Sequence, residues 1–168
     1  MAIVTIKGSP FRTVGALPAV GTKIPEFKLT SADLSDKTLS DYAGKKIVFN
    51  IFPSIDTGTC ASSVRRFNEE AASLGGDVVV LCVSRDLPFA QARFCGAEGL
   101  DRVETLSSMK DDAFGKAFGV TFADGPLEGL FSRSVVVADG SGTVVYTQQV
   151  AETADEPDYA AALAALGV

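Results

Sequence analysis

The sequence predicts an α/β fold, with a central mixed sheet flanked by helices. Two near-continuous apolar runs, at residues 46–52 (KIVFNIF) and 77–84 (DVVVLCVS), are typical of strands covered on both faces. A stripe of apolar residues at helical spacing lies between them. Two β-branched runs at residues 134–150 surround the turn sequence DGSG, which predicts a hairpin. Strands that alternate with helices in this way favour the α/β class.

The chain up to about residue 41 predicts short strands and turns, because apolar and polar residues partly alternate there between Gly and Pro. The first helix should begin near Cys60, at the head of an apolar stripe with steps of 4, 3, 4 and 3 residues. The stripe consists of Cys60, Val64, Phe67, Ala71 and Leu74. Gly75 and Gly76 predict its C-cap. A strand, a helix and a strand within about forty residues form a parallel βαβ unit.

Helices are also expected at residues 88–96, 111–119 and 156–166, with a third strand at 103–108. Pro88 opens the first of these helices, and Pro157 should lie in the first turn of the last. A thioredoxin-like fold is the simplest arrangement that fits this element order.

Composition limits the function classes. At 168 residues the chain is expected to form a single domain, residues 1–168, with a sizeable core. The net charge of -6 argues against nucleic acid or an anionic membrane as the main partner. We find no apolar run of membrane-spanning length and no signal peptide pattern, so we expect a cytoplasmic protein whose thiols are kept reduced.

The sequence contains no histidine. This absence excludes Ser-His-Asp and Cys-His nucleophile pairs and any metal site that needs imidazole. Three cysteines alone also fall short of the usual four-ligand zinc site. We therefore expect neither a metal nor another cofactor, and a catalytic nucleophile would have to be activated without a histidine base.

The segment PSIDTGTC, from Pro53 to Cys60, lies between the first buried strand and the expected helix. At a helix N-terminus the free amide groups and the helix dipole favour a thiolate, so Cys60 is a candidate nucleophile. The alternative is that Cys60 only begins the apolar stripe. Thr57 can donate a hydrogen bond to the thiolate or to a substrate oxygen, and can also be an ordinary N-cap. Pro53 fixes the chain direction and could shield the sulfur from water.

The other two cysteines differ in their surroundings. Cys82 lies within an apolar strand and is expected to be a buried core residue. Cys95 lies near the end of the 88–96 helix, with Gly96 and Gly99 just beyond it. A second thiol on a pliable segment could capture an oxidised Cys60, and the alternative is a partly buried helix residue beside Phe94.

A thiolate without a histidine partner needs a nearby cation. Arg133 is the best placed, because it directly precedes a buried strand and follows a glycine-containing loop. The sequence ranks the competing arginines poorly, although Arg65 and Arg66 are expected to face solvent. The other competitors are Arg85, Arg93 and Arg102.

The spacing Pro53-x-x-x-Thr57-x-x-Cys60 resembles the P-x-x-x-T-x-x-C signature of peroxiredoxins. Residues 50–71, 84–100, 123–137 and 156–166 resemble, more narrowly, the bacterial thiol peroxidases, which are atypical two-cysteine peroxiredoxins. The similarity runs from about Gly8 to the end of the chain.

This resemblance implies a thioredoxin fold with an added N-terminal β-hairpin, and a homodimer. It implies reduction of hydrogen peroxide and alkyl hydroperoxides, with recycling by thioredoxin. Cys60 then matches the peroxidatic cysteine, Cys95 the resolving cysteine of the same chain and Arg133 the active-site arginine. Thr57 and Pro53 match the threonine and proline of the signature. Cys82 matches a third cysteine that turnover does not need.

A disulfide requires the two Cα atoms to lie within about 7 Å, so local unwinding is expected around both Cys60 and Cys95. Residues 122–131 could line an apolar substrate or dimer face. Two other functions are compatible with the fold. One is a thiol–disulfide oxidoreductase that does not depend on Thr57 or Arg133, and the other is a non-catalytic binding or chaperone module.

Overall fold

The structure is a computed structural model that describes residues 1–167. Its strands are β1 (Ile3–Ile6), β2 (Ser9–Arg12), β3 (Lys28–Ser31), β4 (Asp36–Thr38), β5 (Lys46–Ile51), β6 (Val78–Ser84), β7 (Glu104–Ser107), β8 (Ser134–Ala138) and β9 (Val144–Gln149). Its helices are the 3-10 helix η1 (Leu39–Tyr42), α1 (Gly58–Ala71), α2 (Pro88–Glu98), α3 (Ala113–Phe118) and α4 (Tyr159–Ala164). None of the helices described is long and apolar enough to cross a membrane.

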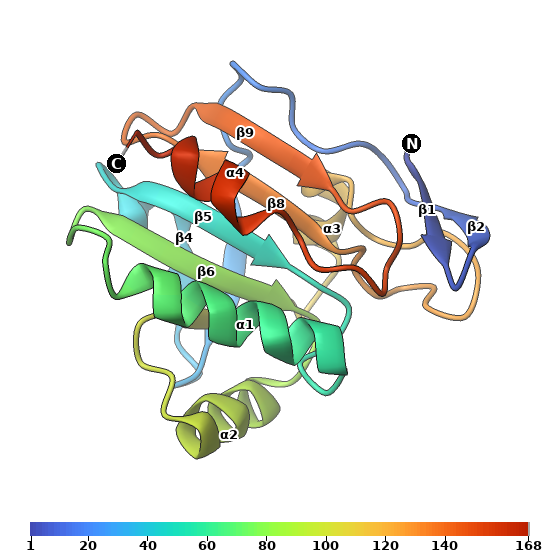
Figure 1. Cartoon of the computed structure of the whole chain (residues 1–168), viewed down its shortest axis with the longest axis horizontal. Coiled ribbons are helices and arrows are strands. Elements are labelled where there is room, and N and C mark those ends of the chain that lie inside the picture. Colours follow the sequence, from blue (N-terminus) through green and yellow to red (C-terminus); the bar gives the residue numbers. More distant parts are fainter. Residues whose placement is uncertain (168) are drawn as a thin grey trace.

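Seven strands form one mixed sheet in the order β4-β3-β7-β6-β5-β8-β9. β5, β6 and β7 are parallel neighbours, and β8 runs antiparallel to β5. The helices α1 and α4 cover one face of this sheet and α3 lies behind the other (Figure 1). The predicted α/β class, the parallel βαβ unit and the C-terminal hairpin are therefore confirmed.

The separate two-stranded sheet is the N-terminal hairpin of β1 and β2, which lies beyond one end of the large sheet (Figure 1). Backbone bonds join this hairpin to the segment after β9: the Thr5 amide donates to Ala151 O at 2.8 Å, and the Thr153 amide to Thr5 O at 2.8 Å. The hairpin that the resemblance implied is thus present, and it contacts the C-terminal part of the chain.

The central strand β5 explains why both faces of the sheet are apolar. Every second side chain, that of Ile47, Phe49 and Ile51, packs in the core shared with α3. Val48, between them, packs in the core shared with α1 and α4. Asn50 also points to the α1 side, where its amide donates to the hydroxyl of Ser63 at 3.1 Å. Alternation of side chains along a strand covered on both faces yields this continuous apolar run.

The predictions for the C-terminal end of α1 and for the start of α4 were wrong. α1 ends at Ala71, and the next three amide groups bond to carbonyls three residues earlier, at 3.1 to 3.3 Å, which tightens the last turn. Neither Gly75 nor Gly76 adopts the left-handed conformation of a C-cap glycine. Pro157 lies before the N-cap Asp158 of α4, not within its first turn. Pro88 does occupy the first turn of α2, and Gly99 is a left-handed C-cap.

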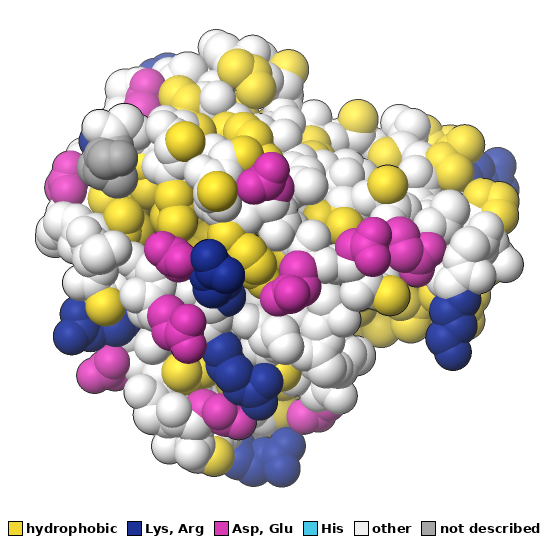
Figure 2. Space-filling view, viewed as in Figure 1, with side chains coloured by type: hydrophobic (Ala, Val, Ile, Leu, Met, Phe, Trp, Pro, Cys, Tyr) yellow, Lys and Arg dark blue, Asp and Glu magenta, His cyan; other side chains and the backbone are white. Residues whose placement is uncertain are grey.

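The face of the molecule formed by α1 and α4 carries basic and acidic side chains side by side (Figure 2). Arg66 pairs with Glu70 one turn along α1, at 2.9 Å. Arg65 pairs with Glu98 of α2 at 2.8 Å, and its guanidinium lies 5.4 Å from the ring centroid of Phe94. Both arginines lie on the surface, as expected, and Arg65 joins α1 to α2.

Candidate active site

The loop between β5 and α1 is held against the end of β6. Asp86, two residues after β6, accepts a hydrogen bond from the hydroxyl of Ser54 at 2.8 Å and one from the amide of Ile55 at 2.7 Å. Pro53 is buried at the start of this loop. The C-terminal ends of the parallel strands β5 and β6 thus fix the segment that leads into α1.

Thr57 is the N-cap residue of α1, with extended backbone angles. Its carbonyl accepts from the amide of Ala61 at 2.9 Å, whereas its hydroxyl donates to Ser54 O at 3.1 Å and does not cap the helix. The side chain of Thr57 is exposed. The ordinary N-cap interpretation therefore holds for the backbone of Thr57 only, and its hydroxyl is accessible from outside.

Cys60 lies in the first turn of α1 and is fully buried. Its sulfur accepts a hydrogen bond from Nη1 of Arg133 at 3.4 Å. Its backbone carbonyl accepts from the hydroxyl of Ser63 at 2.7 Å. Cys60 thus combines the two sequence interpretations, because it begins the apolar stripe of α1 and also contacts a cation.

Arg133 directly precedes β8 and is only 2% exposed. Its Nε and Nη2 atoms donate to Thr153 O at 3.0 and 2.9 Å, which leaves Nη1 directed at the sulfur of Cys60. A buried guanidinium is costly unless a negative partner compensates its charge. Its hydrogen-bond partners are a carbonyl oxygen and this sulfur, so the positive charge of Arg133 lies against the sulfur of Cys60.

The competing arginines all form ion pairs with carboxylates. Arg85 pairs with Asp112 at 2.8 Å, and Arg93 with Asp56 at 3.7 Å. The remaining three are Arg65, Arg66 and Arg102. Among the arginines that the sequence offered, Arg133 is the one that donates a hydrogen bond to the Cys60 sulfur.

A pocket of about 210 Å³ opens beside these groups. Pro53, Thr57 and Arg133 line it, together with the apolar side chains of Leu127 and Leu130. Both leucines belong to the 122–131 segment that was expected to form an apolar substrate or dimer face. The lining thus combines a few polar donors with a mostly apolar wall, as in small-molecule sites.

Cys95 lies elsewhere. It sits in α2, half-buried, and lines a separate cleft of about 430 Å³ with residues that include Asp33 and Lys37. Burial raises the pKa of the Cys95 thiol. The structure thus brings Pro53, Thr57, Cys60 and Arg133 together but keeps the Cys95 thiol free and in a helix.

Cys82 is a buried core residue, as expected. It is fully buried in β6, and burial raises its pKa to about 12, although the amide of Asn50 donates to its sulfur at 3.7 Å. A thiol with this pKa stays protonated at neutral pH and is a poor nucleophile.

The sequence pattern missed two supporting residues. Thr153 orients Arg133 through its backbone carbonyl, a role that any residue type could fill and that leaves no sequence signal. Asp86 shapes the loop before α1, and the run Ser84–Arg85–Asp86 at the end of a buried strand is a typical turn sequence that could have suggested it.

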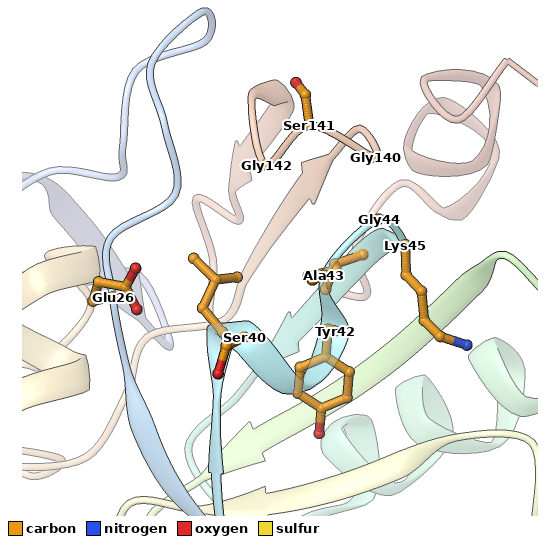
Figure 3. Close-up of a pocket in the computed structure, with 11 residues that line it drawn as sticks. Glu26, Ser40, Tyr42, Ala43, Gly44, Lys45, Gly140, Ser141 and Gly142 are labelled. Atoms are coloured by element: carbon orange, nitrogen blue, oxygen red, sulfur yellow. The ribbon is translucent and has the colours of Figure 1, made fainter.

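A second cleft, of about 260 Å³, lies at the opposite end of the strands (Figure 3). Its lining includes Tyr42, Lys45 and Gly140, beside the start of β5 and just after the end of β8. Cys60 and Arg133, by contrast, lie after the end of β5 and before the start of β8. Within residues 1–167, we find no group of three or more His, Cys, Asp or Glu side chains placed to hold a metal ion.

Comparison with known proteins shows the family to which the chain belongs. Residues 19–163 match the Redoxin family model. The chain is 53% identical over 167 residues to the thiol peroxidases of Mycobacterium tuberculosis and Mycobacterium bovis, with 99% of each chain covered.

Solved structures show the same fold. A peroxiredoxin-like protein from Aquifex aeolicus has a TM-score of 0.90 and 34% identity, over 96% of this chain and 93% of that one. The thiol peroxidase from Chromobacterium violaceum has a TM-score of 0.86 at 24% identity, over 95% of this chain and 91% of that one. The chain therefore belongs to the redoxin family and is a thiol peroxidase of the peroxiredoxin type, an enzyme that reduces peroxides with electrons from thiols.

Proposed function

We propose that Cys60 is the peroxidatic nucleophile and that Thr57 and Arg133 position the peroxide beside it. The observation that carries this assignment is the hydrogen bond from buried Arg133 to the Cys60 sulfur, next to the pocket that Thr57 lines. The Cys60 thiolate attacks one peroxide oxygen, an S–O bond forms and the O–O bond breaks. The departing oxygen takes a proton and leaves as water or an alcohol, and Cys60 becomes a sulfenic acid.

Charge builds on the departing oxygen during this step. A guanidinium carries five N–H groups, and the hydrogen bonds of Arg133 to Thr153 and Cys60 use three of them. The remaining N–H groups of Arg133 are donors that can stabilise that charge, and the hydroxyl of Thr57 can join them once its O–H turns away from Ser54 O. Pro53 lines the same pocket and limits access of water to the sulfur.

Cys95 is the proposed resolving cysteine. Its thiol attacks the sulfur of the Cys60 sulfenic acid, an S–S bond forms and water leaves. Both cysteines lie in helices of the reduced protein, in α1 and α2, so the disulfide requires local unwinding of these helices. Cys82, buried and with a raised pKa, is less suited to this role.

The proposal also covers the substrates, the reductant and the oligomeric state. The apolar wall of Leu127 and Leu130 supports alkyl hydroperoxides as substrates in addition to hydrogen peroxide. A thioredoxin is the proposed reductant of the Cys60–Cys95 disulfide, in a cytoplasmic homodimer. The dimer predicts sedimentation at twice the chain mass at micromolar concentration, and a monomer there would contradict it.

One single-turnover experiment tests the assignment of both cysteines. Pre-reduced protein is mixed with one equivalent of cumene hydroperoxide in stopped flow, and disulfides are mapped by peptide mass. We expect fast thiol loss and a Cys60–Cys95 link within one chain. Cys60→Ser should abolish the fast phase, while the matched control Cys82→Ser should retain it.

A thiol–disulfide oxidoreductase is the alternative that this experiment also addresses. If thiol loss occurs at the rate of an ordinary free thiol, the peroxidatic assignment fails. Rapid reaction with a protein disulfide that is unchanged in Thr57→Val and Arg133→Lys variants would then support disulfide exchange.

A further inference from the structure

The turn of the N-terminal hairpin has an unusual conformation. Lys7 and Gly8 connect β1 to β2, and both have positive φ angles, 50° and 81°. A two-residue turn with two positive φ angles favours Asn-Gly or Asp-Gly, because other residues rarely adopt the left-handed region. The conformation of Lys7 therefore requires support from outside the hairpin.

Glu152 supplies that support. Its Oε1 accepts from the amide of Lys7 at 2.9 Å and its Oε2 from the amide of Gly8 at 3.1 Å. The hydroxyl of Thr5 also donates to the carboxylate. These bonds lower the pKa of Glu152 to about 2, and the bond from Thr5 makes the largest contribution to that shift. The ionised carboxylate thus holds both amides of the turn.

The hairpin turn is also part of the active-site pocket. Ile6, Lys7 and Glu152 line this pocket together with the leucines of the 122–131 segment. Ile6 adds apolar surface to the wall, immediately before the turn that Glu152 holds. The position of this wall therefore depends on the conformation of the turn.

The position of Arg133 depends mainly on other contacts, although the amide of Ala154 also donates to Oε1 of Glu152, at 3.3 Å. The backbone bonds between Thr5 and residues 151 and 153, at 2.8 Å each, join the segment after β9 to β1 without the Glu152 side chain. The Thr153 carbonyl that orients Arg133 belongs to this segment. Loss of the Glu152 carboxylate should therefore displace the turn more than the catalytic arginine.

We propose that Glu152 is a positioning residue for substrate selectivity: it holds the Lys7–Gly8 turn so that Ile6 forms a wall for the organic group of an alkyl hydroperoxide. This role rests on the proposed function, because it concerns the same pocket. Hydrogen peroxide has no organic group to contact the wall, so the two substrates should respond differently to a change at Glu152.

The test compares Glu152→Gln with the wild type on cumene hydroperoxide and on hydrogen peroxide. The variant loses the charge that strengthens the bonds to the turn, so the ratio of kcat/KM for hydrogen peroxide to that for cumene hydroperoxide should rise about tenfold, through KM. Ile6→Ala should change the same ratio in the same direction. An unchanged ratio in Glu152→Gln would overturn the proposal.

Asp139→Asn is the matched control. Asp139 holds the β8–β9 turn in the same manner, by accepting from the amides of Ser141 and Thr143 at 2.9 and 3.1 Å. It lies about 20 Å from Arg133 along β8. The ratio should stay at the wild-type value in this variant, and an equal rise there would show a general loss of stability instead.

A second substitution separates turn geometry from a direct contact of Glu152 with substrate. Lys7→Asn introduces a residue that favours the left-handed conformation. In the Glu152→Gln background it should restore the ratio most of the way to the wild-type value. If the double variant keeps the ratio of Glu152→Gln, the inference that Glu152 acts through the turn is wrong.

Amide hydrogen exchange distinguishes failure of this inference from failure of the proposed function. Exchange at Lys7 and Gly8 should accelerate about tenfold or more in Glu152→Gln, whether or not the protein reduces peroxide. If the wild type does not reduce peroxide but Glu152→Gln still exchanges faster at Lys7 and Gly8, the proposed function fails. The conclusion that Glu152 holds the turn then remains. An active enzyme with an unchanged ratio would refute the selectivity role alone.

Discussion

Arg133 is the residue that links the segment after β9 to the proposed nucleophile in a protein without histidine. Its guanidinium is fixed by the carbonyl of Thr153 on one side and directed at the sulfur of Cys60 on the other. The planar guanidinium, with several N–H groups in a fixed arrangement, makes both contacts at once. A lysine has one terminal nitrogen on a flexible stem and does not reproduce this geometry.

Arg133→Lys should therefore lower the rate constant of thiol oxidation by peroxide about 100-fold or more, because it removes donors aimed at the developing charge. Stopped-flow oxidation of the pre-reduced variant measures this rate. The matched control is Arg85→Lys, which alters a half-buried ion pair with Asp112 away from the pocket. A rate within threefold of the wild type for Arg133→Lys would contradict the proposed role of the guanidinium geometry.

At this scale the sequence predicted which residues lie together at the pocket but not the contacts that hold them there. Cys60, Thr57 and Pro53 share one short segment whose spacing is readable, and Arg133 was favoured by its place before a strand. Thr153 and Glu152 act through a carbonyl and through bonds to backbone amides. Contacts of this kind depend on which segments meet in space, so the local sequence pattern did not predict them.

Among the elements, the contact between α1 and α2 governs the motion that the proposed resolving step requires. Arg65 of α1 donates to Glu98 near the end of α2 at 2.8 and 3.1 Å, and it stacks over Phe94, the neighbour of Cys95. Unwinding of α2 must break these contacts. The Arg65 side chain is 43% exposed, so solvent screens the pair and its contribution is modest.

Arg65→Ala should therefore speed formation of the Cys60–Cys95 disulfide about fivefold, because it removes both the ion pair and the stacking contact that hold helical α2 against α1. Quenched-flow alkylation followed by peptide mass measures that rate after rapid oxidation of Cys60.

Arg66→Ala is the control for this experiment. Arg66 pairs with Glu70 and lies 5.1 Å from the ring centroid of Tyr159, so it makes the same two kinds of contact without touching α2. Its disulfide rate should equal that of the wild type. If both variants accelerate equally, α1 stability and not the contact with α2 controls the step.

The elements themselves were largely predictable from periodicity, whereas some of their ends were not. The stripe of α1 extends to Leu74, which packs against the core, although regular α-helical bonding ends at Ala71. A tightened last turn keeps the apolar spacing while it changes the hydrogen bonds. The pattern of apolar residues therefore locates the buried face of a helix better than its final residue.

For the whole molecule, the sheet order is the feature that the sequence did not predict. β3, from the N-terminal part, pairs with β7 through only two residue pairs, Thr30 with Ser107 and Ser31 with Leu106. Such long-range pairing depends on the complete fold. The N-terminal hairpin was expected only from the resemblance, since its short strands carry few buried residues.

The absence of histidine also determines how the stability of the whole molecule should depend on pH. No imidazole titrates, so the free energy of unfolding should stay nearly constant between about pH 5.5 and 7.5. Below this range, hydrogen-bonded carboxylates decide the profile. The pKa of Glu152 is lowered to about 2, mainly by Thr5, and that of Asp139 is lowered by Ser141.

A lowered pKa in the folded state means that the unfolded chain binds more protons in acid, so stability falls as the pH drops below about 4.5. In alkali the sign is opposite for the buried thiols. The pKa of Cys82 is raised to about 12 by burial, and that of Cys95 is raised by the same cause. Unfolded thiols lose protons above about pH 8.5 while the folded ones keep them, so stability falls there too.

Thermal unfolding of the reduced protein, followed by circular dichroism from pH 2 to pH 10, tests this profile. We expect a plateau in Tm near neutral pH with a decline on both sides. Cys82→Ser should reduce the alkaline decline, because it removes the thiol whose pKa shift is the larger. A Tm that changes by more than a few degrees between pH 5.5 and 7.5 would contradict the assignment, since it would require a strongly coupled group that titrates in that range.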